Sequence, residues 1–188
     1  VPSVLATAFD IMQCIIVGVW LCVRYKIKII HARSYIPSVI ALTLKKLFNV
    51  KYIFDMRGFW ADERIDGGLW PKGGRIYRVA KWFEKRFLLS ADSVVSLTNA
   101  AVDEMKKFDY LQGRLPNFKV ITTCTDLNLF DFKKTNNNNS SKESFVVGYV
   151  GSVGVWYLFD ETLNCFKLIL EKVPSAKLHI INRGGHQY

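Results

Sequence analysis

Short β-branched runs alternate with longer segments of helical periodicity along this chain, and this alternation restricts the possible folds more than any other feature. The runs lie at Ile27–Ile30, Tyr52–Phe54, Ser93–Leu97 and Lys119–Thr122. Between them lie segments with helical spacing at 34–48, 75–89 and 99–108. Parallel strands need crossover connections of this length. The pattern therefore predicts an α/β fold, with a Rossmann-like parallel sheet and flanking helices.

Two of the predicted helices show further local signals. Ser34 is the candidate N-cap of the first, and Asn49 suits the left-handed position that ends it. The helix at 75–89 carries an apolar stripe that is expected to face the core: Ile76, Val79, Ala80, Phe83 and Phe87.

Composition narrows the class of protein further. Half of the 188 residues are apolar and 22% are charged, which excludes a disordered tail or a fibre. The formal net charge of +10 favours an anionic partner: nucleic acid, an acidic membrane surface or a phosphorylated small molecule. We rank nucleic acid last, because the aromatic residues follow core periodicity and no nucleic-acid-binding motif is present.

The cysteines and histidines do not have the spacing of a metal site. The four cysteines, at positions 14, 22, 124 and 165, form no C-x-x-C pair, and the three histidines are scattered. We therefore predict no metal and no cofactor. Reduced thiols are the default in the cytoplasm, so we expect a cytoplasmic protein.

The most apolar segment, residues 4–23, has about the length that spans a bilayer. Asp10 and Gln13 interrupt it, and the apolar run that follows is too short to cross a membrane. We predict a buried helix here, and the alternative is a membrane-associated helix.

A change in composition divides the chain. Residues 135–144 include a polar, asparagine-rich tract, which predicts a flexible linker. We assign 1–134 to a partial first Rossmann-like domain and 145–188 to the start of a second, which has one βαβ unit. The chain begins with Val1 and stops soon after the last predicted strand, so we expect further chain at both ends.

Polar residues and glycines follow the predicted strands, at the edge where parallel sheets bind ligands. Arginine side chains and helix N-termini satisfy phosphate oxygens, so these positions suit a phosphate-bearing ligand. Alternatively, the arginines make only surface ion pairs, and the histidine is held by an ordinary strand-end hydrogen bond. The candidate residues are His31, Arg33, Asp55, Arg57, Gly58, Thr98, Asn99, Thr125, Gly151, Ser152 and Gly154.

The predicted helix at 75–89 is strongly basic. Arg78, Lys81, Lys85 and Arg86 surround Trp82, a combination that suits contact with an anionic membrane surface. The alternative is an ordinary solvated amphipathic helix.

Four landmarks in order resemble the family 4 glycosyltransferases of the GT-B fold. The residues Ile29–Arg33 resemble that family's D-h-h-H-x-H strand end, and Tyr52–Arg57 its next strand end, which usually carries a histidine. The stretch Val120–Phe130 resembles V-I-P-N-G-V-D-x-x-x-F, and Gly148–Gly154 resembles the opening strand of the nucleotide-binding domain.

This resemblance implies transfer of a hexosyl group, with retention of configuration, from a nucleotide-sugar donor to a lipid-linked or polysaccharide-precursor acceptor. It implies catalytic roles for His31, Asp55 and Arg57 on the first domain's wall of the cleft. There Arg57 stabilises charge on the departing phosphate or holds the acceptor. The implied substrate-binding residues are Arg33, Gly58, Thr98, Asn99, Thr125, Gly151, Ser152, Gly154, Arg183 and Gly184.

The chain departs from the family pattern at basic positions. Arg33 and Arg57 stand where the family usually has histidines, Ser152 replaces a common arginine, and the partner lysine has no counterpart. The family's E-x7-E element would lie beyond Tyr188, so we expect this chain alone to be inactive. Two alternatives are a GT-B-type sugar-nucleotide epimerase and a non-catalytic module that binds a membrane or a partner. For an enzyme, we expect a location at the inner face of the membrane.

Overall fold

The computed structural model of the chain describes residues 4–130, 145–153 and 158–182. The chain divides into two compact units, Val1–Cys124 (unit 1) and Thr125–Tyr188 (unit 2). The predicted linker at 135–144 lies outside the described residues.

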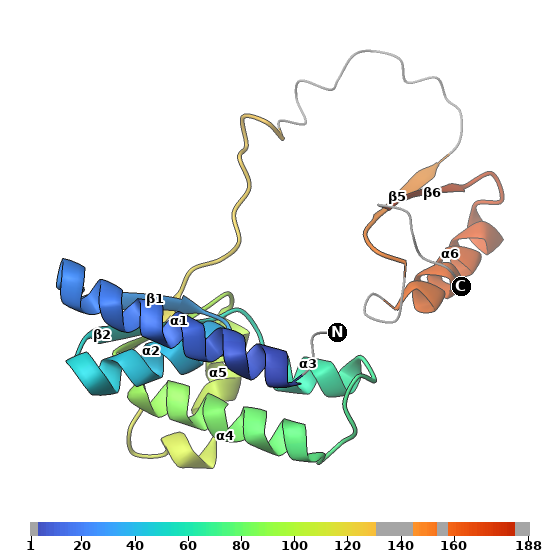
Figure 1. Ribbon diagram of the computed structural model, residues 1–188. Helices are drawn as coiled ribbons and strands as arrows, with labels where there is room; N and C mark the ends of the chain where they lie inside the picture. Colours follow the sequence, from blue (N-terminus) through green and yellow to red (C-terminus); the bar gives the residue numbers. More distant parts are fainter. Residues whose placement is uncertain (1–3, 131–144, 154–157, 183–188) are drawn as a thin grey trace. The chain divides into compact units, whose positions relative to one another are not determined.

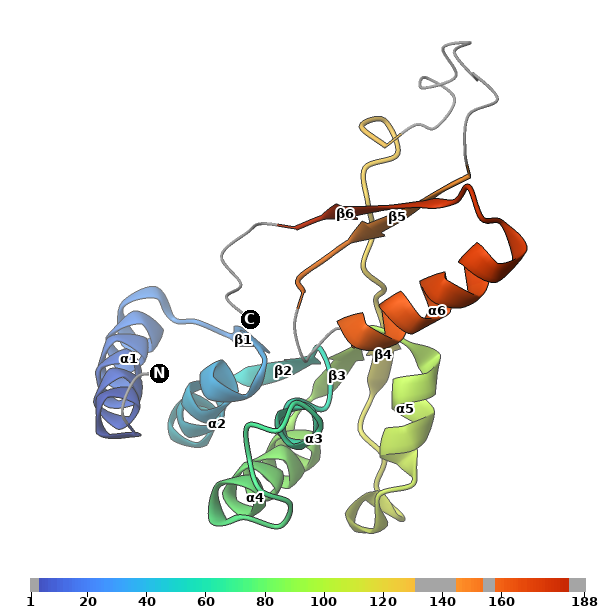
Figure 2. The ribbon, with the colours of Figure 1, turned by 90° about the vertical axis from the view of Figure 1, so that its right-hand side faces the viewer.

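Unit 1 contains a parallel sheet of four strands in the order β1-β2-β3-β4, of which Figure 1 labels β1 and β2 and Figure 2 labels all four. The strands are β1 (Ile29–Arg33), β2 (Lys51–Met56), β3 (Ser93–Ser96) and β4 (Phe118–Val120). Their connections contain α2 (Tyr35–Phe48), α3 (Trp60–Asp66), α4 (Arg75–Ser90), α5 (Asn99–Lys106) and a 3-10 turn at Asp109–Leu111. The predicted Rossmann-like α/β fold is confirmed.

The helices that connect the strands lie on one face of this sheet. Figure 2 shows α2, α4 and α5 on the same side of β1–β4, as right-handed crossovers between sequential strands require. Tyr52, Phe54 and Val94 point to that side and are fully buried. Alternate residues on the opposite side, such as Ile53 and Asp55, are only partly buried. The core of unit 1 therefore lies between the sheet and this one layer of helices.

Asp92 joins three elements at the amino edge of the sheet. Its carboxylate accepts hydrogen bonds from the Tyr52 backbone N–H at 2.8 Å and from Lys45 Nζ at 2.5 Å, and Lys51 Nζ lies 3.3 Å away. Burial alone would raise the pKa of Asp92, but these hydrogen bonds outweigh it and lower the pKa to about 2.

Most predicted elements are confirmed within a few residues, and the differences occur at turns. The left-handed residue Asn49 ends α2 as predicted, with its N–H bonded to the Lys45 carbonyl. Ser34 was predicted to cap α2 and does not; its own N–H donates to the Asp55 carbonyl, and Ser38 Oγ donates to the Ser34 carbonyl. The short helix α3 was not predicted, because its seven residues, about two turns, give too little periodicity.

The predicted burial of the first helix is wrong. Helix α1 (Val4–Tyr25) packs on α2 through a narrow contact, where Gly18 lies against Leu44, and it buries Cys22. Its other sides are open: Phe9 is 54% exposed and Ile16 is 61% exposed. Residues Leu5–Tyr25 are long and apolar enough to cross a membrane, which by itself is weak evidence for a span.

Helix α4 contributes a buried charged group to the interior of unit 1. The Glu84 carboxylate is fully buried, accepts a hydrogen bond from the Tyr35 hydroxyl and lies 2.5 Å from Lys81 Nζ. Lys81 also donates to Asp62 at 3.0 Å. Burial would lower the pKa of Lys81, but its contacts with Glu84 and Asp62 raise it. Lys81 therefore does not belong to an exposed basic face with Lys85 and Arg86, as the sequence suggested.

Unit 2 has the predicted βαβ order. Strands β5 (Val146–Val150) and β6 (Lys177–Ile181) pair in parallel, and α6 (Phe159–Lys172) connects them. Tyr149 packs edge-on against Phe159 at 5.2 Å, which joins the helix to the strand pair. No described residue of α6 is fully buried, so this pair of strands encloses little core.

The lowered pKa of Asp92 predicts a specific dependence of stability on pH. The charged carboxylate stabilises the folded state fully above pH 4, and this contribution disappears as the pH falls toward 2. We expect Asp92→Asn to lower the free energy of unfolding by about 1 kcal/mol at pH 7, allowing for solvent screening. Denaturant melts of both proteins between pH 7 and 2.5 should show this difference shrinking; a constant difference would contradict the assignment.

The Glu84 cluster predicts opposite outcomes for two charge reversals on one helix. Lys81→Glu places a third carboxylate beside Glu84 and Asp62, and should destabilise the fold by about 3 kcal/mol or more. Arg78→Glu reverses an exposed charge on the same helix and should stay within about 0.5 kcal/mol. Thermal melts of the two variants test this, and equal stabilities would contradict the buried role of Lys81.

Candidate functional site

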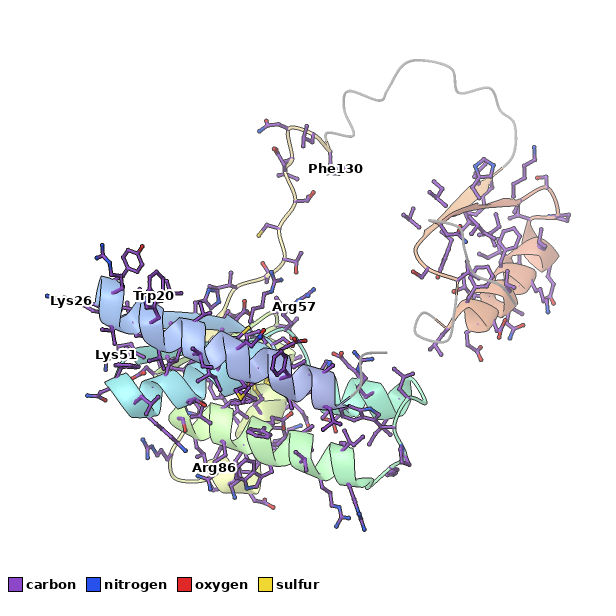
Figure 3. All side chains as sticks on the ribbon, in the orientation of Figure 1. Trp20, Lys26, Lys51, Arg57, Arg86 and Phe130 are labelled. Atoms are coloured by element: carbon purple, nitrogen blue, oxygen red, sulfur yellow. The ribbon has the colours of Figure 1, made fainter. Side chains whose placement is uncertain are left out.

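The first three strands of unit 1 end at the same edge of the sheet and bring the predicted site residues of that unit together. Figure 3 labels Arg57, just after the end of β2, and Lys51, at the start of the same strand. The two residues lie at opposite edges of the sheet. The carboxyl edge of β2 is therefore separated from the Asp92 contacts by the length of the strand.

Asp55 organises the polar residues of β1. His31 Nε2 lies 3.3 Å from Asp55 Oδ2, and Arg33 Nε lies 3.7 Å from the same oxygen. Arg33 and Asp55 are direct partners in the parallel register of β1 and β2. The carboxylate is mostly buried, whereas the histidine and arginine are exposed. This arrangement holds an imidazole and a guanidinium at the surface through one shared anion.

Arg57 is exposed and lies at the rim of a cavity of about 260 Å³. Within the described ranges it has no ion pair: Asp55 contacts His31 and Arg33, and Asp62 is bound by Tyr77 and Lys81. The cavity is lined by Ser34, Arg57, Gly58, Trp60, Glu63 and Leu97. An arginine without a carboxylate partner beside a hollow is able to bind an anion.

Gly58 lies in close contact with the side chain of Glu63. A Cβ atom at position 58 would lie 2.3 Å from Glu63 Oε1, so any other residue would push that carboxylate aside. The glycine therefore lets α3 approach the end of β2 closely. Sequence reasoning missed Glu63 and Trp60 as site residues, because the short helix that carries them was not predicted.

A neighbouring cavity of about 440 Å³ differs in charge. It lies between α3, α4 and α5, and carboxylates outnumber Lys81, its one cation among the described lining residues. Repulsion between carboxylates and phosphate makes it unsuitable for a phosphorylated ligand. The Arg57 cavity, where one carboxylate, that of Glu63, stands against one guanidinium, is therefore the better anion site of the two.

Thr98 and Asn99 follow β3 as predicted, and the structure gives Thr98 a structural role. Its hydroxyl accepts a hydrogen bond from the Ala101 N–H at 3.1 Å and so caps α5. Asn99 is the exposed first residue of that helix. The cap orients the start of α5 at the carboxyl edge of the sheet.

The remaining predicted site residues belong to unit 2. Thr125 is exposed, and Gly151 follows β5 with its N–H bonded to the Ile181 carbonyl. The Ser152 carbonyl accepts a hydrogen bond from the Tyr149 hydroxyl at 2.7 Å, which closes this turn. Gly154, Arg183 and Gly184 lie outside the described residues. In the described parts of the chain, no group of three His, Cys, Asp or Glu residues could hold a metal ion.

The sequence at 9–114 matches the glycosyl transferase 4-like domain, which covers more than half of the chain. The chain belongs to this family. The matched region holds seven predicted site residues, His31, Arg33, Asp55, Arg57, Gly58, Thr98 and Asn99. The predicted resemblance to GT-B glycosyltransferases of family 4 is thereby confirmed. No curated protein matches the chain significantly.

Gly58 allows a test of the local geometry in this glycosyl transferase 4-like domain. Gly58→Ala should destabilise the fold by about 1 kcal/mol, because only the flexible end of Glu63 has to move. In a Glu63→Ala background the same change should be nearly neutral, since the obstructing carboxylate is gone. A double-mutant cycle measured by denaturant melts detects this coupling, and additive effects would rule out the contact.

Proposed function

We propose that the protein transfers a hexosyl group from a nucleotide-sugar donor to a lipid-linked or polysaccharide-precursor acceptor, with retention of anomeric configuration. Membership of a glycosyltransferase family supports transferase activity with a sugar donor and an acceptor. The observation that carries the assignment of the site is Arg57, an exposed guanidinium without an ion-pair partner in the described parts of the chain, beside a cavity at the carboxyl edge.

The chemistry requires a group that stabilises a leaving phosphate. When the bond between the sugar C1 and the diphosphate oxygen breaks, negative charge develops on that oxygen while a bond forms to the acceptor hydroxyl. A guanidinium keeps its positive charge at any working pH. Arg57 therefore stabilises the negative charge on the leaving oxygen or holds an anionic acceptor. It does not transfer protons.

His31 on β1 and Asp55 on β2 supply a second function, which is removal of the acceptor proton. As the acceptor oxygen attacks, its proton has to leave, and the exposed imidazole of His31 is the group at this edge that we propose receives it. Asp55 orients the imidazole through the 3.3 Å contact. Arg33, Gly58, Thr98 and Asn99 complete the substrate-binding surface of unit 1 in this proposal.

Unit 2 takes the donor in the same proposal. Gly151, Ser152, Gly154, Arg183 and Gly184 contact the donor diphosphate, and Thr125 borders the substrate. The small size of the glycines allows a backbone to approach phosphate closely. The described strand pair of unit 2 encloses little core, so we propose that the 188-residue chain by itself is inactive.

The setting of the reaction is also part of the proposal. The enzyme needs no metal or cofactor, acts in the cytoplasm at the inner face of the membrane, and does not bind nucleic acid. The exposed cations Arg78, Lys85 and Arg86 on α4 make a peripheral contact with anionic lipid, each adding about 1 kcal/mol near the surface.

Substitutions of Arg57 test the proposed role of its charge. They are made in a protein that contains this chain and has transferase activity. Arg57→Ala should lower kcat about 100-fold or more, the scale for removing one preorganised donor. Arg57→Lys should keep part of the activity, because it keeps the charge and loses the planar geometry.

The control is thermal stability measured on the same three proteins. Arg57 is exposed and has no ion pair in the described ranges, so neither substitution should lower Tm appreciably. An Ala variant that is destabilised but fully active would remove Arg57 from the site.

A further inference from the structure

The apolar stripe of α4 is only partly used by the core. Ala80 and Phe87 are buried against the sheet and α2, but Ile76 is 56% exposed and Val79 is 55% exposed. The sequence predicted all of them as one core-facing stripe, together with Phe83. The amino-terminal half of α4 therefore presents apolar side chains that unit 1 leaves open.

These open side chains border a cavity of about 180 Å³ between α2, α3 and α4. Trp60 and Trp70 form one wall and pack edge to face at 5.0 Å, and Ile36 and Val39 line the α2 side. Tyr35 also borders the cavity, but its hydroxyl is bonded to Glu84. An apolar cavity of about 150 Å³ is large enough to bind benzene, so this one has room for a short length of hydrocarbon.

A second hollow borders this cavity on α4 and is lined by Arg75, Arg78, Val79, Trp82 and Phe83. The two hollows share Val79 and Phe83. We call them together the α2–α4 groove. Arg75 and Arg78 are exposed and have no ion pair within the described ranges, so the rim of this apolar groove is cationic.

Trp60 connects the groove to the candidate site. Its side chain lines the apolar cavity and also the cavity of about 260 Å³ that holds Arg57. The apolar cavity and the Arg57 cavity therefore adjoin at Trp60.

We infer that the α2–α4 groove binds the hydrocarbon chain of a lipid-linked acceptor that carries a phosphate. This inference rests on the proposed function, of which it specifies the acceptor. The apolar walls remove the chain from water, and the arginines at the rim bind the phosphate. The groove selects the acceptor, and Trp60 is the residue that it shares with the Arg57 cavity.

Other occupants fit these walls less well. A peptide would bring amide groups that need hydrogen-bond partners, and the cavity is lined almost entirely by apolar side chains that offer none. A second copy of the chain would set the same cationic rim against a protein of net charge +10, which repels it. An anionic amphiphile satisfies both the apolar walls and the arginines.

Single-chain amphiphiles used below their micelle concentrations test the groove on the 188-residue chain. The probes are hexyl phosphate, decyl phosphate and decanol. Their binding is measured by calorimetry and by the change in tryptophan fluorescence. Each added methylene should raise affinity about fourfold until the cavity is filled. The double variant Arg75→Gln with Arg78→Gln should weaken the binding of decyl phosphate about fivefold or more and leave the binding of decanol unchanged.

Val79→Trp blocks the groove, and Val23→Trp is its matched control. Both valines are exposed on helices, and only Val79 lines the groove. We expect Val79→Trp to weaken the binding of decyl phosphate about tenfold or more. Val23→Trp should leave this binding unchanged. Equal binding by both variants, or affinity that does not depend on chain length, would overturn the inference.

A vesicle experiment separates an acceptor lipid from the bulk membrane. Vesicles of phosphatidylcholine with phosphatidylglycerol should bind Val79→Trp as strongly as the unchanged chain, because contact with bulk lipid needs only surface charge. A parallel loss of vesicle binding and decyl phosphate binding would assign the groove to bulk lipid and overturn the inference. Failure of the proposed function appears separately, as full activity of Arg57→Ala.

Discussion

The parallel register of β1 on β2 determines which side chains reach the ligand-binding edge. Tyr52, Phe54 and Met56 all face the helices and are buried, so β2 has one orientation in which its apolar side is covered. That orientation turns Asp55 to the other side, opposite Arg33 in the register. A slip of one residue would move the carboxylate into the aromatic core, at a large desolvation cost. The geometry of the site thus follows from the burial of residues that take no part in it.

Tyr35 connects the aromatic core with the buried carboxylate of Glu84. Its ring packs edge-on against Phe87 at 5.9 Å and against Phe54 at 6.1 Å, and its hydroxyl donates to Glu84. Burial raises the pKa of Tyr35 well above its ordinary value, so the hydroxyl keeps its proton and remains a donor. The same residue begins α2, directly after Ser34 at the Arg57 cavity. Packing in the centre therefore fixes the backbone at the edge.

The sequence predicted the strands and long helices well, because their signal is local periodicity. The end of α2 at Asn49 and the bounds of α4 are of this kind. The buried state of α1 was mispredicted, because apolar composition does not say which neighbours are present to cover a helix. Lys81 looked like a surface cation because its partners, Asp62 and Glu84, come from two elements. The site residues after β1 and β2 followed from topology, whereas Trp60 and Glu63 depended on the unpredicted helix α3.

The two edges of the unit 1 sheet have different roles, one structural and one in the candidate site. Asp92 ties helix and strands at the amino edge, while Arg57 at the carboxyl edge has no ion pair in the described part of the chain. A residue that contributes nothing to holding the scaffold can be exchanged without a penalty in folding, so the carboxyl edge is open to evolutionary change. Arg57 is such a residue, whereas Arg33 at the same edge is paired with Asp55. New specificities can then arise on an unaltered framework.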